Sequence, residues 1–198
     1  WNAYGAEYIP VPSDDDGMVT DELEQALRCG PKFIYCLPNF HNPLGVTLPY
    51  KRREKLIEMA NHFGVPIIED DPYGQLRFEG EHIPSVVVMD SQLTQSNGSY
   101  SGNVIYLSTF SKTLAPGLRL AWIVAPAEVI RKLVQAKQGA DLNTAVFNQI
   151  LAYEVGKGGF IDQHVKHIIE VYKERRNAML ESLEENMPEG VHWTHPQG

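Results

Sequence analysis

The feature that most constrains the fold of this 198-residue chain is the alternation of short β-rich runs with helical stretches. That order is typical of an α/β domain with a mostly parallel sheet and helices on both faces. Strands are predicted at residues 7–11, 32–37, 65–68, 104–107 and 119–125, with a weaker apolar run at 83–89. Helices are predicted at residues 21–29, 49–63, 126–139, 145–155 and 160–186.

The glycine-rich run at residues 156–159 marks the predicted domain boundary. We expect a large domain over residues 1–158 and the beginning of a smaller α/β domain over residues 159–198. The chain starts at Trp1 without an initiator methionine or a leader pattern, so we expect an internal piece of a longer protein, with Trp1 ending a preceding helix. Residues 90–103, rich in Ser, Gln, Asn and Gly, predict a surface loop.

Composition excludes several classes of protein. Seventeen basic against 25 acidic residues give a net charge of −8, which disfavours binding to nucleic acid. No apolar stretch approaches the ~18 residues of a membrane span. Cys29 and Cys36 match no metal or redox spacing and are expected to be buried thiols in a reducing compartment, the cytoplasm. His164 and His167 lie near Glu170 without an obvious third ligand, so we expect exposed histidines and no metal site.

Three polar clusters follow predicted strands, at residues 42–45, 70–73 and 108–119. Ligands of parallel sheets gather at the carboxyl ends of the strands, so these clusters are candidates for one site. The run Ser111-Lys112-Thr113 imitates the end of a phosphate-binding P-loop but lacks the required glycines, and no strand leads into a G-x-G-x-x-G turn. The clusters therefore predict neither a P-loop nor a dinucleotide fold.

Taken together, the three clusters resemble the class I/II aminotransferases of fold type I, which are pyridoxal-phosphate enzymes. The matching stretches are residues 38–45 (PNFHNPLG), 68–74 (IEDDPYG) and 108–122 (STFSKTLAPGLRLAW). Residues 137–142 (KQGADL) are similar to the branch that contains 2-aminoadipate aminotransferase. The resemblance implies the large domain of a pyridoxal-phosphate-dependent transferase.

The resemblance assigns the catalytic roles. Lys112, at a strand end and shielded from water, would form the internal Schiff base (aldimine) and shuttle the proton. An ionised carboxylate should contact the pyridine nitrogen, and the family's acid lies three residues before a tyrosine, which selects Asp70 over Asp71. Asp71 is then a structural acid whose side chain should face the other way. Tyr73 and Asn42 match the two donors to the phenolic oxygen of the ring.

The phosphate ligands implied by the resemblance are Thr109, Ser111 and Arg119, and Thr109 stands where serine is commoner in the family. The aromatic residue that stacks on the ring, the rest of the phosphate loop and the arginine that binds the substrate carboxylate are expected outside this stretch. We expect a homodimer in the full-length protein and an inactive fragment when this stretch stands alone.

The sequence thus predicts a pyridoxal-phosphate-dependent amino-acid:2-oxoacid aminotransferase whose substrates are amino acids and 2-oxo acids. Three alternatives stay open. One is a β-lyase or decarboxylase on the same fold, and a second is a catalytically inactive binding module. The third is an effector domain of a winged-helix transcription regulator, which would show a basic DNA-binding segment before this stretch.

Overall fold

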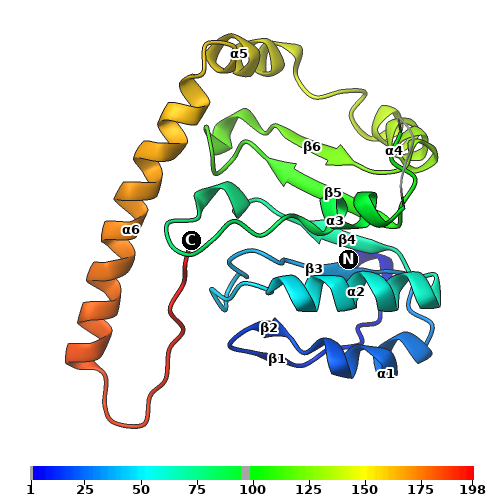
Figure 1. Ribbon diagram of the computed structural model, residues 1–198. Helices are drawn as coiled ribbons and strands as arrows, with labels where there is room; N and C mark the ends of the chain where they lie inside the picture. Colours follow the sequence, from blue (N-terminus) through cyan, green and yellow to red (C-terminus); the bar gives the residue numbers. More distant parts are fainter. Residues whose placement is uncertain (1, 95–98) are drawn as a thin grey trace.

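The computed structural model describes residues 2–94 and 99–198, and its centre is a four-stranded sheet (Figure 1). The strands lie in the order β3 (Ile34–Cys36), β4 (Ile67–Asp70), β5 (Val104–Thr109) and β6 (Ala121–Val124). β3, β4 and β5 are parallel, and β6 is antiparallel to β5. The predicted α/β fold with a mostly parallel sheet flanked by helices is confirmed.

Three helices cover one face of this sheet: α1 (Leu23–Arg28), α2 (Tyr50–Phe63) and α3 (Val86–Leu93). α2 begins after Pro49 and ends at Gly64, whose φ of 65° only glycine adopts without strain. Their apolar side chains form one core with alternate strand residues, including Leu56, Ile57, Ala60, Ile34, Ile67 and Val104. Burial of this apolar area is the main stabilising force of the domain.

The other strand residues point to the opposite face, because side chains alternate along a strand. Tyr35 is 44% exposed there, and Ile68, Asp70 and Leu107 are half-buried. Within the described residues, this face is therefore the more open of the two. It is the face that carries the candidate site.

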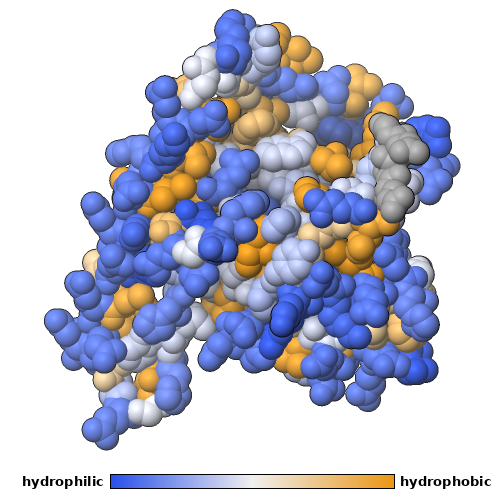
Figure 2. All heavy atoms as spheres, viewed as in Figure 1, coloured by the Kyte–Doolittle hydropathy of each residue, from blue (hydrophilic) through white to orange (hydrophobic). Residues whose placement is uncertain are grey.

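The second half of the chain contains three further helices, α4 (Ala127–Ala140), α5 (Val146–Gly156) and α6 (Phe160–Asn186). α6 follows Gly159, which has a φ of 77°, and its range is the one predicted from the sequence. Figure 1 shows α6 standing beside the sheet, with α5 at its upper end and residues 187–198 returning towards the sheet. Figure 2 shows apolar side chains at the surface over α4, α5 and the inner side of α6.

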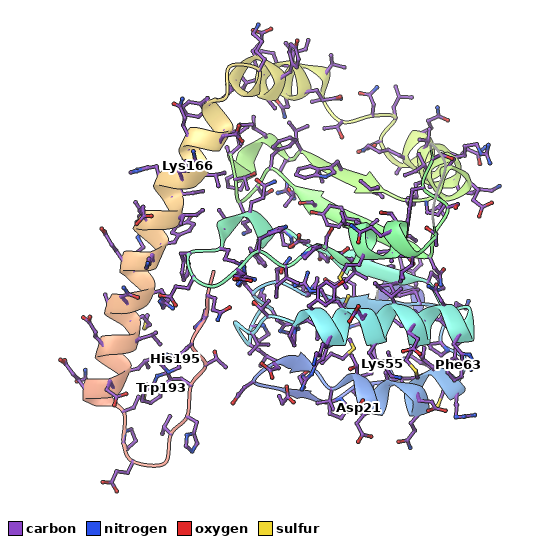
Figure 3. All side chains as sticks on the ribbon, viewed as in Figure 1. Asp21, Lys55, Phe63, Lys166, Trp193 and His195 are labelled. Atoms are coloured by element: carbon purple, nitrogen blue, oxygen red, sulfur yellow. The ribbon has the colours of Figure 1, made fainter. Side chains whose placement is uncertain are left out.

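Hydrogen bonds fix the terminal segment, residues 187–198, to the chain at Phe78 and Glu79 and to helix α6. The backbone N–H groups of Phe78 and Glu79 both donate to the carbonyl of Gln197, at 2.9 and 3.1 Å. Arg176 of α6 pairs with Glu79 and donates to the carbonyl of Pro196 at 2.6 Å. In Figure 3, the labelled Trp193 and His195 mark this segment where it passes α6.

Some sequence predictions about the fold are wrong. Residues 7–11 are not a strand, and the nearest strands are the two-residue β1 (Ser13–Asp14) and β2 (Gly17–Met18). Residues 86–89 of the apolar run at 83–89 lie in helix α3, where the buried carboxylate of Glu69 accepts the N–H groups of Val86 and Val87 at 2.8 and 2.9 Å. A negative charge at a helix N-terminus stabilises its unpaired N–H groups. Of the predicted loop 90–103, residues 90–93 belong to α3 instead. Residues 95–98 of this loop, and Trp1, lie outside the described residues.

The cysteine prediction is half wrong, because Cys29 is exposed while Cys36 is buried. Burial, with the neighbouring Glu69 carboxylate, raises the pKa of the Cys36 thiol. His167 is exposed as predicted, whereas His164 is half-buried and stacks on Phe160 with ring centroids 5.7 Å apart. None of the helices in the described part of the chain is long and apolar enough to cross a membrane.

Candidate active site

The candidate site lies at the carboxyl ends of β4 and β5. Asp70 ends β4 and pairs in register with Leu107, two residues before Thr109 at the end of β5. Asp70 and Thr109 therefore lie on the same face of the sheet. On the neighbouring strand β3, the hydroxyl of Tyr35 donates a 2.6 Å hydrogen bond to the Asp70 carboxylate. Burial, together with this carboxylate, raises the pKa of Tyr35, which keeps the phenol a proton donor.

Asp71, the next residue, lies in a different environment. It is 7% exposed and accepts hydrogen bonds from the Asn39 amide and the Gly74 N–H, both at 3.0 Å. The hydroxyl of Tyr106 also donates to it at 3.3 Å, and burial raises the pKa of Tyr106 to about 12. Asp71 is thus tied into the protein interior, while Asp70 remains half-buried on the open face.

Lys112 lies in the turn that follows β5, three residues beyond Thr109. Its Nζ is 5.7 Å from the centroid of the Tyr73 ring, which brings two of the predicted catalytic residues together. The turn is closed by the N–H groups of Leu114 and Ala115, which both donate to the carbonyl of Phe110. The Lys112 side chain is exposed among the described residues, so the prediction of a lysine shielded from water is wrong for this stretch.

Two of the predicted phosphate ligands are in direct contact. The Oγ atoms of Thr109 and Ser111 are 2.9 Å apart, and Thr109 Oγ1 also accepts the Ser111 N–H at 3.1 Å. Thr109 donates to the carbonyl of Leu120, the residue after Arg119. Arg119 itself is exposed, has a φ of 53°, and its guanidinium donates to the Pro116 carbonyl at 3.3 Å. The Thr109 bond to Leu120 thus brings the backbone beside Arg119 close to the hydroxyl pair. Among the described residues, no hydrogen bond joins the Arg119 guanidinium to Thr109 or Ser111.

Asn42 lies in the loop formed by residues 38–48, which joins β3 to α2. Its side chain is exposed, and the Asn42–Pro43 peptide bond is cis. The loop is closed by hydrogen bonds from His41 N–H to the Val46 carbonyl and from Leu48 N–H to the Pro38 carbonyl, both at 2.8 Å. Among the residues that the structure describes, no hydrogen bond joins Asn42 to Tyr73 or Lys112.

Three residues beside the site were missed by sequence reasoning: Tyr35, Asn39 and Arg53. Tyr35 alternates with the buried Ile34 and Cys36, and this alternation was the signal for a side chain on the open face. Arg53 is 0% exposed and continues the apolar stripe of α2, three residues before Leu56. A cation on an apolar helix face was the available signal, because charged residues are rarely fully buried without partners. Asn39 carried no such signal.

The candidate site residues are partly accessible to solvent, since Lys112 is exposed and Asp70 and Tyr73 are half-buried. A cavity of about 610 Å³ lies further along the molecule, lined by residues of β6, α5 and the start of α6 and by Phe110. A second, of about 270 Å³, lies between residues 45–47 and the terminal segment. Neither cavity is lined by Asp70, Tyr73 or Lys112.

The fold is an α/β domain, and the cluster at the carboxyl ends of its strands is a candidate site for a polar ligand. The sequence matches the family of class I and II aminotransferases over residues 1–198. The chain therefore belongs to the class I and II aminotransferase family, and the resemblance drawn from its motifs is confirmed.

Known relatives agree with this assignment. The chain is 46% identical over 201 residues to aromatic-amino-acid aminotransferase 1 of Thermococcus litoralis, covering 98% of this chain and 46% of that protein. The solved structure of LysN, the α-aminoadipate aminotransferase of Thermus thermophilus, complexed with N-(5′-phosphopyridoxyl)-L-leucine, has a TM-score of 0.89 at 39% identity, over 98% of this chain and 48% of that one.

A regulator is also similar to the chain. The uncharacterized HTH-type transcriptional regulator YisV of Bacillus subtilis is 33% identical over 95% of this chain and 37% of its own length. The chain spans about half the length of the aminotransferase relatives and less of the regulator.

Proposed function

We propose that the protein containing this chain is a pyridoxal-phosphate-dependent amino-acid:2-oxoacid aminotransferase. The observation that carries the proposal is the grouping of an amine, a carboxylate and a phenol, from Lys112, Asp70 and Tyr73, where β4 and β5 end. The family membership and the similarity to aminotransferases over almost the whole chain support it.

The chemistry of the residues present fits pyridoxal phosphate. When bound, this cofactor supplies an aldehyde that joins covalently to amines and a ring that accepts electrons from the substrate's α-carbon. Lys112 offers the amine, and the Asp70 carboxylate suits a protonated pyridine nitrogen. The hydroxyl pair of Thr109 and Ser111, with the Arg119 cation, suits a phosphate group.

Each candidate site residue of this chain has a distinct role in the proposed reaction. Lys112 would hold the cofactor through its amine. Once the substrate's amine has replaced it, the freed Nζ would take the proton from the substrate's α-carbon. Asp70, oriented by the Tyr35 hydroxyl, keeps a proton on the ring nitrogen. Tyr73 and Asn42 donate to the ring's phenolic oxygen and fix the ring plane, which decides which substrate bond breaks.

Two other outcomes stay open. A β-lyase or a decarboxylase would use the same residues with a different bond aligned to the ring. The similarity to the regulator YisV supports a domain of a transcription regulator as the second alternative. In an effector-sensing domain of that kind, the lysine and the acid would still hold the cofactor. An intact set of lysine, acid and arginine argues against an inactive binding module.

Mapping the cofactor attachment tests the proposal. The full-length protein is loaded with pyridoxal phosphate, reduced with borohydride, digested and analysed by mass spectrometry. We expect the adduct on Lys112, and loss of the bound-cofactor absorbance when amino acids such as 2-aminoadipate, glutamate, leucine or aromatic amino acids are added. An adduct on another lysine, for example the exposed Lys137, would overturn the assignment.

The wider setting is also a proposal. We expect the full-length protein to be a cytoplasmic homodimer that does not bind nucleic acid, with domains divided between residues 158 and 159. The exposed apolar side chains of α5, namely Val146, Phe147, Ile150 and Tyr153, support a subunit contact. Sedimentation of the full-length protein and of its Phe147→Asp variant tests the dimer.

A further inference from the structure

A buried polar chain links the two segments proposed to hold the cofactor ring. One segment is the loop 38–48, which carries Asn42, and the other is the turn 71–74, which carries Tyr73. Asn39 lies between them, 6% exposed. Its Oδ1 accepts a 2.6 Å hydrogen bond from Arg53, and its Nδ2 donates a 3.0 Å hydrogen bond to Asp71.

Arg53 anchors the loop at both ends. Its Nε donates to the carbonyl of Leu48 at 2.8 Å, and its Nη2 donates to the carbonyl of Pro38 at 3.1 Å. Its Nη1 reaches the carbonyl of Pro84 at 2.9 Å, before α3. The planar guanidinium holds these acceptors in a fixed geometry, which fixes the loop to the rigid helix α2.

The turn is held equally closely. The Asp71 carboxylate that receives the Asn39 amide also accepts the N–H of Gly74, the residue after Tyr73. A Cβ atom at Gly74 would lie 2.5 Å from Asp71 Oδ2 and 2.9 Å from Asn39 Nδ2. The Asn39 side chain therefore packs directly against the backbone next to Tyr73, with no room for a larger residue.

We propose that Asn39 is a positioning residue whose side-chain amide sets the separation between Asn42 and Tyr73. This role rests on the proposed function, in which both residues contact the cofactor ring. A side-chain amide suits this position because its oxygen accepts a hydrogen bond from Arg53 and its nitrogen donates one to Asp71. A carboxylate at this position would face Asp71 without a proton to share.

The consequence is a specific effect on the cofactor. Removal of the amide leaves the side chains of Tyr73 and Asn42 unchanged, but the distance between them is no longer fixed. We expect Asn39→Ala to raise the dissociation constant for pyridoxal phosphate at least fivefold. Because Asn39 acts through the placement of Tyr73, the effect of Tyr73→Phe should be at least threefold smaller in the Asn39→Ala background than in the parent.

The test is a cofactor titration of the full-length apoprotein, followed by absorbance, with a thermal unfolding curve for each variant. The control is Asn103→Ala, which removes a half-buried side-chain amide away from the site. Its Nδ2 donates to the Val65 carbonyl at 3.0 Å, just before β4 and β5 begin. We expect this control to lose stability and to bind the cofactor within twofold of the parent. Asn39→Asp, which keeps the size and the acceptor but loses the donor to Asp71, gives a second variant that should also bind at least fivefold more weakly.

Each alternative result has a clear meaning. Parent-like binding by Asn39→Ala and Asn39→Asp, additive effects with Tyr73→Phe, or equal weakening by Asn103→Ala would overturn the positioning role. Such results leave the proposed function intact, because the parent still carries the cofactor on Lys112. A parent that does not bind pyridoxal phosphate would overturn the proposed function, and the positioning role with it.

Discussion

The hydroxyl of Tyr35 and the carboxylate of Asp70 form a 2.6 Å hydrogen bond between residues 35 positions apart in the chain. Parallel pairing of β3 with β4 makes this contact possible, because Tyr35 pairs in register with Ile68, two residues before Asp70 on the same face. The acid proposed for the ring nitrogen is therefore oriented by a phenol from the neighbouring strand. Asp71 is oriented by interior groups instead.

Because Asp70 and Asp71 have different surroundings, we expect their substitutions to affect different properties: the reaction rate for Asp70 and the stability for Asp71. Asp70→Asn keeps the shape but removes the charge, and a hydrogen bond to a charged group is worth ~1.5 to 3 kcal/mol. We expect the amino-acid half-reaction of the full-length protein to slow at least tenfold with the cofactor still bound. Asp71→Asn should mainly lower the free energy of unfolding. Single-turnover absorbance and denaturant unfolding of both variants measure this, and the reverse ranking of their rates would show that Asp71 is the ring acid.

Removal of the Tyr35 hydroxyl should weaken the site without removing a charge. The hydrogen bond to the charged Asp70 is worth ~1.5 to 3 kcal/mol, and part of it acts on the cofactor through Asp70. Tyr35→Phe should therefore raise the dissociation constant for pyridoxal phosphate at least ~fivefold. The matched control is Tyr8→Phe, which removes an exposed hydroxyl that donates to Asn2 at 2.6 Å. Cofactor titration compares the two. Equal affinities for both variants would mean that Tyr35 does not support Asp70.

Arg53 should be among the most sensitive positions for stability. Burial lowers the pKa of its guanidinium, and the charges of Glu69 and Asp71 oppose that shift. Arg53→Met leaves these acids and several carbonyls without their cation, and loss of one member of a buried charged group costs about 3 to 5 kcal/mol. Arg28→Met removes an exposed pair with Glu24 and should cost at most about 1 kcal/mol. Urea unfolding of the full-length variants gives both values, and similar losses would contradict the prediction.

The sequence pattern correctly predicted elements whose bounds depend on neighbouring residues. α6 begins after Gly159 and follows a helical period of apolar residues, so its range was predicted correctly. The apolar run at 83–89 was not assigned to a helix, because valine-rich stretches favour strands, yet its residues 86–89 lie in α3. Its helix is stabilised at its start by Glu69, whose bonds to Val86 and Val87 span 17 and 18 residues. No window of local sequence contains that contact.

Some residues of the candidate site could likewise be predicted from the sequence, and others could not. Lys112, Asp70 and Tyr73 follow strands in recognisable motifs, and the structure gathers them at one edge of the sheet; their roles stay predictions. Arg53 was missed because an arginine on a helix is ordinarily solvated, and its acceptors lie up to 31 residues away. The exposure of Lys112 was also unforeseeable, since burial depends on what packs around a side chain rather than on the residue itself.

Glu69 gives a pH dependence of stability with a definite sign. Burial, only partly offset by the N–H groups of Val87 and Val86, raises its pKa from the ordinary value of 4.5 to about 7. Between these values the folded protein holds a proton that the unfolded chain has released. The free energy of unfolding therefore falls as the pH rises through this range, by about 1.4 kcal/mol per pH unit for this one group.

Comparison with Glu69→Gln isolates this contribution, because all other titrating groups are shared. We expect the unfolding free energy of the parent, relative to the variant, to decrease steadily from pH 4.5 to 7 and to level off above that range. Glu58→Gln, an exposed carboxylate on α2 beside Lys55, is the control and should follow the parent at every pH. Urea unfolding of the full-length proteins at intervals of about half a pH unit measures the three curves. A parent that gains stability over Glu69→Gln as the pH rises would mean that the N–H groups of α3 outweigh burial and hold the carboxylate ionised.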